Sequence, residues 1–196
     1  MIQYLVLISL PLAIIGTGAY IKDTLVGKTK PNKITWLMWS IAPLIATFAA
    51  ISKGVSWAVL PVFMSGFCPL LVLIVSLFSK KSYWKLSLFD YLCGFFSVLA
   101  LILWVITKEA NIAIIFSIIS DASAGFPTLK KAWTNPETES VLIYATGIIS
   151  ALTSFAAVEY GIFSEYAFPI YLLLMNTILV VLISRSKIFK KAFVKK

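Results

Sequence analysis

The carboxylate of Asp121 is the group in this sequence best suited to chemistry. It lies near the middle of an apolar segment at 110–132, about eleven residues or roughly 16 Å from the start of a helix. A carboxylate inside a membrane is costly and is a functional candidate by default, able to bind a solute or carry a proton. Ser120, Ser123 and Gly125 make the surrounding helix face polar and small. The alternative is a protonated or hydrogen-bonded contact that packs this helix against another.

Cys68 and Asn176 are two further polar groups inside apolar segments, and they are 108 residues apart. The amide of Asn176 offers donors and acceptors that suit the hydroxyl groups of a solute. The alternative is a hydrogen bond between helices, which is common for asparagine in membranes. Asp90 and Glu109 lie at the edges of their segments, a position more typical of the membrane interface than of a binding site.

Enzyme chemistry is not expected. The sequence has no histidine, which removes the usual base, proton shuttle and transition-metal ligand. It contains no recognisable nucleophile–base arrangement, phosphate-binding loop or carboxylate pair. The two cysteines, Cys68 and Cys93, lie in apolar segments without metal-ligand spacing, and we expect free thiols. We therefore expect neither a cofactor nor a bound metal.

The elements that must position these residues are membrane helices. Of the 196 residues, 60% are hydrophobic and only 13% are charged, whereas a soluble domain is about a quarter charged. A spanning helix needs roughly 20 mostly apolar residues. We expect an all-α membrane protein with seven spanning helices, at 3–21, 34–52, 57–79, 86–107, 110–132, 138–158 and 165–184. The first is expected to be a structural helix and not a signal peptide, because no Lys or Arg precedes its apolar run.

The lysines predict the orientation of these helices. The net charge is +9, but the basic residues cluster in alternate loops and at the C-terminal end, which favours a cytoplasmic membrane face over nucleic acid. We expect the N-terminus outside, the C-terminus in the cytoplasm, and contact of the basic end with anionic lipid in the cell (inner) membrane. The basic groups on this side are Lys22, Lys28, Lys30, Lys33, Lys80, Lys81, Lys85, Lys130, Lys131, Arg185, Lys187, Lys190, Lys191, Lys195 and Lys196.

The sequence repeats itself. A shift of 108 places Tyr4–Asp23 on 112–131 and Pro61 on Pro169, and a shift of 105 places Trp39 on Tyr144. We expect a 3+1+3 arrangement of two parallel three-helix repeats, at 1–79 and 109–184, joined by a linker helix within 80–108 and followed by a basic tail at 185–196. Paired hydrophobic halves are typical of transporters with a central site in the membrane. Trp39 and Tyr144 lie deeper than the other interfacial aromatic residues and could face that site.

The second repeat carries the sequence Phe126-Pro127-Thr128-Leu129-Lys130-Lys131, followed after a short gap by Asn135-Pro136-Glu137-Thr138-Glu139-Ser140. This resembles the proline–glutamine helix end and short basic loop of the SWEET, SemiSWEET and PQ-loop superfamily, with Thr128 in place of the glutamine. The resemblance implies that Asn176 and Cys68 face a sugar pocket. It also implies that Pro43 and Pro127 act as flexing points, although the hinge prolines at the matching positions are absent.

The same resemblance implies a second pair of pocket residues. Family members place an aromatic or small polar residue about four helical turns before the asparagine. Counting back 16 residues from Asn176 and from Cys68 predicts Tyr160 and Ser52. The alternative for Tyr160 is a tyrosine of the interfacial belt.

Three functions are compatible with these residues. The leading one is a transporter that moves a small polar solute, expected to be a sugar, by alternating access between the two repeats. The second is a proton-coupled carrier of an amino acid or related metabolite that uses Asp121. The third is a non-transporting membrane receptor or scaffold, because the related KDEL receptor binds peptides with this fold and fold alone does not decide function. Besides the solute and the lipid bilayer, a homo-oligomer is a possible partner.

Overall fold

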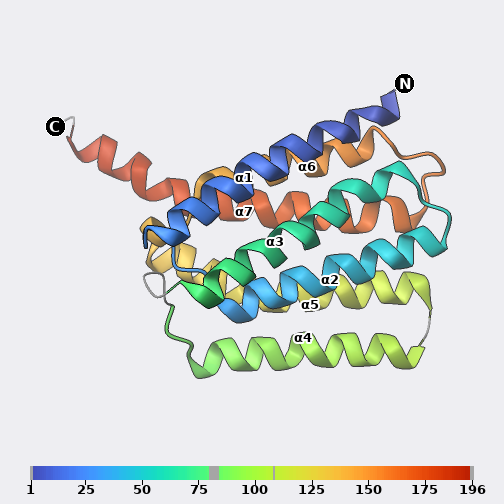
Figure 1. The fold of residues 1–196 in the computed structure, drawn as a ribbon, viewed down its shortest axis with the longest axis horizontal. Helices are drawn as coiled ribbons and strands as arrows, with labels where there is room; N and C mark the ends of the chain where they lie inside the picture. Colours follow the sequence, from blue (N-terminus) through green and yellow to red (C-terminus); the bar gives the residue numbers. More distant parts are fainter. Residues whose placement is uncertain (1, 80–83, 108, 195–196) are drawn as a thin grey trace.

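The computed structural model describes residues 2–79, 84–107 and 109–194, and these residues contain helices and no strand (Figure 1). The all-helical fold class is therefore confirmed, and each predicted segment overlaps one α-helix. The elements are η1 (Ile2–Ile8), α1 (Ser9–Leu25), α2 (Lys33–Ser52), η2 (Trp57–Val59), α3 (Leu60–Phe78), α4 (Leu88–Thr107), α5 (Ala110–Thr134), η3 (Pro136–Thr138), α6 (Val141–Phe155) and α7 (Phe163–Val194).

Five helical stretches are long and apolar enough to cross a membrane: Gln3–Leu25, Lys33–Ser52, Trp57–Phe78, Ala110–Thr134 and Phe163–Arg185. Val141–Phe155 and Leu88–Leu99 are shorter apolar helices. Large apolar side chains cover the outside of the bundle; Phe78, for example, is 82% exposed. A soluble protein rarely exposes so much apolar surface, so the helices are consistent with a multi-pass membrane protein.

Local sequence signals account for several helix ends. The Asn32 side chain caps α2 by accepting hydrogen bonds from the backbone N–H groups of Ile34 and Thr35 at 3.1 and 3.3 Å. Gly54 follows α2 with φ = +84°, a conformation that favours glycine and ends the helix. The expected basic tail from 185 is not a separate segment, because α7 continues to Val194; residues 195–196 lie outside the described residues.

Six helices form a ring. Around it α1 contacts α3, α3 contacts α2, α2 contacts α5, α5 contacts α7, α7 contacts α6, and α6 contacts α1. Helix α4 lies outside the ring, mainly against α5 and to a smaller extent against α2 (Figure 1). Its Asp90 is tied to the loop before α2, since the Asn32 side-chain amide donates to Asp90 at 2.5 Å. Asp90 is thus a buried, hydrogen-bonded anchor for α4. The expected junctions of the linker at 80–83 and 108 lie outside the described residues.

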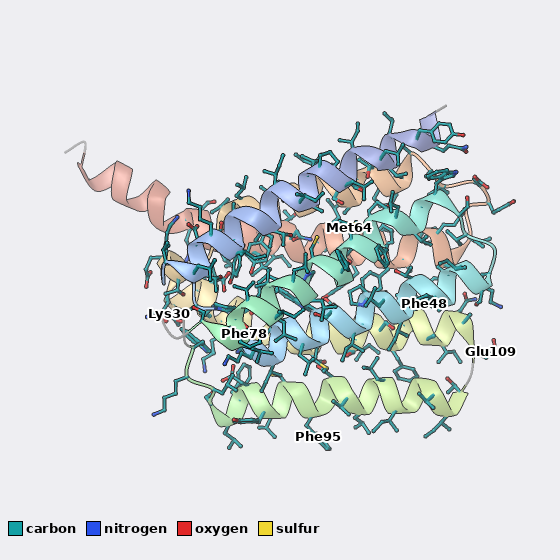
Figure 2. All side chains as sticks on the ribbon, in the orientation of Figure 1. Lys30, Phe48, Met64, Phe78, Phe95 and Glu109 are labelled. Atoms are coloured by element: carbon teal, nitrogen blue, oxygen red, sulfur yellow. The ribbon has the colours of Figure 1, made fainter. Side chains whose placement is uncertain are left out.

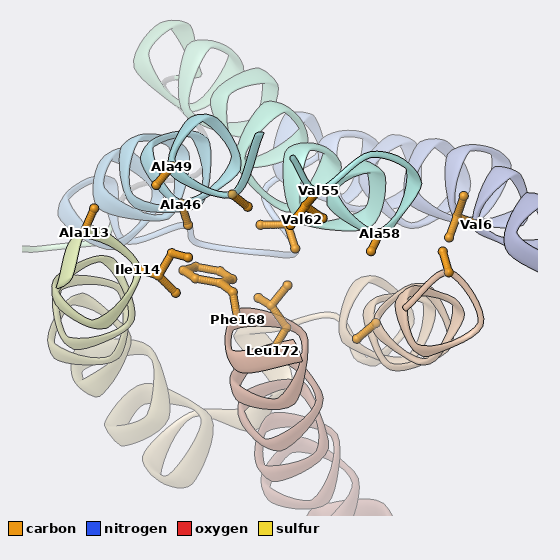
Figure 3. Packing of buried hydrophobic residues seen from close by; sticks show 13 residues of the cluster. Val6, Ala46, Ala49, Val55, Ala58, Val62, Ala113, Ile114, Phe168 and Leu172 are labelled. Atoms are coloured by element: carbon orange, nitrogen blue, oxygen red, sulfur yellow. The ribbon is translucent and has the colours of Figure 1, made fainter. Parts of the chain in front are cut away.

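The lysine-bearing loops lie together at one end of the bundle. In Figure 2, Lys30 marks this end and Glu109 the opposite one. Two clusters of buried side chains occupy the two ends of the ring. The cluster near Glu109, drawn in Figure 3, is entirely apolar and includes Val6, Ala46, Ala49, Val55, Ala58, Val62, Ala113, Ile114, Phe168 and Leu172. The cluster near Lys30 is largely aromatic and includes Tyr20, Trp36, Trp39, Tyr144, Val72, Met175, Leu179 and Ile183.

Candidate functional site

A cavity of about 100 Å³ lies inside the ring. Each of the six ring helices contributes lining residues, and α4 contributes none. Since a buried water needs roughly 10–15 Å³ on this measure, the space holds several waters or one small solute. The cavity is therefore enclosed by the elements that the repeat relates and by no others.

Residues related by the repeat meet in this cavity. Ala13 and Asp121, Met64 and Leu172, and Cys68 and Asn176 are each 108 residues apart, while Trp39 and Tyr144 are 105 apart; all eight line the cavity. In three of these pairs the second half supplies the more polar or hydrogen-bonding group: Asp121 opposite alanine, Asn176 opposite cysteine, and Tyr144 opposite tryptophan. The cavity consequently has one more polar and one more apolar side.

Asp121 is held in place with one oxygen left over. It is 2% exposed. The Tyr171 hydroxyl donates to its Oδ2 at 2.6 Å, and the Trp39 indole N–H donates to its backbone carbonyl at 3.1 Å. Its Oδ1 has no hydrogen-bond partner among the described residues. Buried polar atoms are rarely left unpaired, so this oxygen is available to a donor on a bound solute or to a proton.

Asn176 lies on α7 at the wall of the same cavity. Its amide nitrogen donates to the Leu172 carbonyl of its own helix at 2.8 Å. Helix α6 approaches the amide closely, because a Cβ added to Gly147 would lie 2.7 Å from the Asn176 Oδ1. The absence of a side chain at Gly147 thus makes room for the amide. Cys68, its repeat partner, is a buried free thiol that lines the cavity from α3.

The structure does not bring Tyr160 or Ser52 into the cavity. Tyr160 lies in the loop between α6 and α7 and is 68% exposed, and Ser52 is the last residue of α2. The prediction counted helical turns back from Asn176, but α7 begins at Phe163, so the count leaves the helix and enters the loop. Trp39 and Tyr144 provide the aromatic groups of the cavity instead, with ring centroids 6.3 Å apart.

The predicted flexing residues lie beside the cavity, not in its lining. Pro43 is inside α2 and Pro127 inside α5, two helices that pack against each other, and both prolines are buried. Thr128 is also buried, and its hydroxyl has no hydrogen-bond partner among the described residues. Their role as flexing points stays a prediction.

A buried polar cluster next to the aromatic end of the cavity was missed by the sequence reasoning. Lys131 and Glu139 form an ion pair with both side chains 0% exposed. The hydroxyls of Tyr20 and Tyr144 both donate to Glu139 Oε2, at 3.1 and 2.9 Å. The Lys131 ammonium also donates to the Lys30 carbonyl at 2.5 Å. Both charged residues lie in the basic motif that had been interpreted as a solvated loop, and only the presence of a carboxylate eight residues after the lysine hinted at a pair.

Comparison with known proteins adds no assignment. No protein-family model matches the chain, and neither the curated proteins nor the solved structures contain a match. Among the described residues, no group of three or more Cys, Asp or Glu side chains could hold a metal ion.

Proposed function

We propose that this protein is a membrane transporter that moves a small polar solute, with a sugar as the first candidate, by alternating access between two halves. The observation that carries the proposal is the cavity whose lining pairs Trp39 with Tyr144 and Cys68 with Asn176. A site at the interface of two repeats is the arrangement by which many transporters expose one solute to either side. The resemblance to the SWEET and PQ-loop superfamily supports the same function.

The proposed architecture is 3+1+3. The neighbours within one half, α1–α3 and α2–α3, correspond to α5–α7 and α6–α7 in the other half, and the contact α1–α6 corresponds to α2–α5. Such matched contacts support two equivalent bundles related by a pseudo-two-fold axis, with α4 as the linker. In this proposal all seven helices cross the cell membrane, and the lysine-bearing end faces the cytoplasm and anionic lipid.

The cavity volume bears on the solute. At about 100 Å³ it is smaller than typical ligand pockets of about 300–1,000 Å³. A hexose therefore needs the cavity to widen, which the opening step of alternating access provides. A smaller polar solute would fit with little rearrangement.

A specific observation favours the second function, proton-coupled transport. Asp121 has one unpartnered oxygen and faces the cavity, so the carboxyl group can take up and release a proton where the solute binds. The chain contains no histidine that could do this instead.

Uptake into proteoliposomes, with and without a pH gradient, separates these functions. If transport is proton-coupled, Asp121→Asn abolishes accumulation driven by the gradient and spares exchange. If Asp121 only orders the solute, both modes fall together. Asp23→Asn makes the same chemical change outside the cavity lining and serves as the control. Wild-type kinetics in Asp121→Asn would refute any transport role for this residue, and failure to move any solute would leave the receptor function.

A further inference from the structure

We propose that Tyr20, Lys131, Glu139 and Tyr144 form a gate that closes the cavity at the lysine-bearing end and must come apart when the cavity opens there. We call these four residues the charged gate. The inference rests on the proposed transport function, since it assigns the moving part for one of its two openings. Its test nevertheless needs no solute.

The charged gate joins the two halves of the ring. Tyr20 belongs to α1 of the first half, whereas Lys131, Glu139 and Tyr144 belong to the second half. Glu139 accepts hydrogen bonds from both tyrosines on one oxygen and pairs with Lys131 through the other. The Lys131 ammonium also binds the carbonyl of Lys30, in the loop between α1 and α2. Any motion that separates the halves at this end must break these bonds across the interface.

The gate lies between the cavity and the basic end. Tyr144 is shared by both, because its ring lines the cavity and its hydroxyl binds Glu139. A chain of aromatic rings completes the layer, with centroids 4.8 Å apart for Tyr20 and Trp36 and 5.6 Å apart for Trp36 and Trp39. All of these side chains are buried. On the far side, the Lys131 ammonium lies 5.1 Å from the ring centroid of Trp84.

The chemistry of the layer suits an element that opens and closes. A buried ion pair is costly to break one partner at a time, but both charges regain hydration when water enters. Opening the charged gate into water is therefore partly compensated. The opposite end is closed by apolar side chains such as Val62, Ile114 and Phe168, which gain nothing from water. The two ends of the cavity are thus closed by different chemistry, and only the lysine-bearing end carries an ionic lock among the described residues.

The cavity contains its own probe. Cys68 lines the cavity, and Cys93→Ala leaves it as the only thiol in the chain. In vesicles, a membrane-impermeant methanethiosulfonate reagent is applied from the lysine-bearing side, and the rate of Cys68 labelling is measured. Glu139→Gln opens the proposed gate. Glu137→Gln makes the same change two residues away on an exposed side chain and is the matched control.

We expect Glu139→Gln to raise the labelling rate from the lysine-bearing side by about tenfold or more, the factor for losing one charge-assisted hydrogen bond from the closed state. Glu137→Gln should label like the parent. Because Glu139→Gln leaves Lys131 unpaired and may not fold, Lys131→Met combined with Glu139→Gln removes both charges and should also label faster. An unchanged rate in the folded double variant overturns the gate, and so does an equal rise from both sides, which would indicate general loosening. Either result leaves solute uptake as a separate question.

Discussion

Replacing Gly16 by alanine tests whether the contact between α1 and α6 holds the ring together. A Cβ at position 16 would overlap the Thr146 hydroxyl and lie 3.2 Å from the backbone Cα of Ile143. Overpacking of this kind costs about 1–3 kcal/mol. Gly18 lies in the same helix with nothing within 4 Å of its added Cβ, so Gly18→Ala measures the gain in helix propensity alone, up to about 1 kcal/mol.

The assay is the free energy of unfolding in mixed micelles of increasing SDS content. We expect Gly16→Ala to be less stable than Gly18→Ala by about 1–3 kcal/mol. Adding Thr146→Ala to Gly16→Ala should recover part of the loss, because it removes the hydroxyl that the new methyl meets. Equal stability of the two glycine variants would show that α1 and α6 are not packed as closely as the structure has them.

Three further predictions concern the ends of the bundle. Asn32→Ala removes the cap of α2 and should lower the free energy of unfolding by about 0.5–2 kcal/mol in the same assay. Lys131→Met and Glu139→Gln should each cost about 3–5 kcal/mol, and the double variant less than their sum; additive losses would contradict a buried pair. Lys28→Cys and Lys53→Cys, both at exposed positions, should react with an impermeant thiol reagent from opposite sides of the membrane, and reaction of both from one side would overturn the topology.

The sequence alone determined the class of the protein and the rough position of each helix. These follow from local composition, because a run of about 20 apolar residues has few stable alternatives to a membrane helix. The repeat was also visible, and with it the correspondence of Cys68 with Asn176 and of Trp39 with Tyr144. Asp121 was recognisable because its charge stands out in an apolar segment. All five residues line the cavity.

Only the tertiary structure decided which side chains share a surface. Helical counting carried Tyr160 out of α7 and into a loop, because the position of the helix start depends on the turn before it and not on distance from Asn176. Glu139 and Lys131 looked like ordinary loop charges, yet docking of α1 against α6 buries them beside Tyr20 and makes them a pair. Burial of a charge depends on residues more than a hundred positions away in the chain, and no local pattern records those contacts.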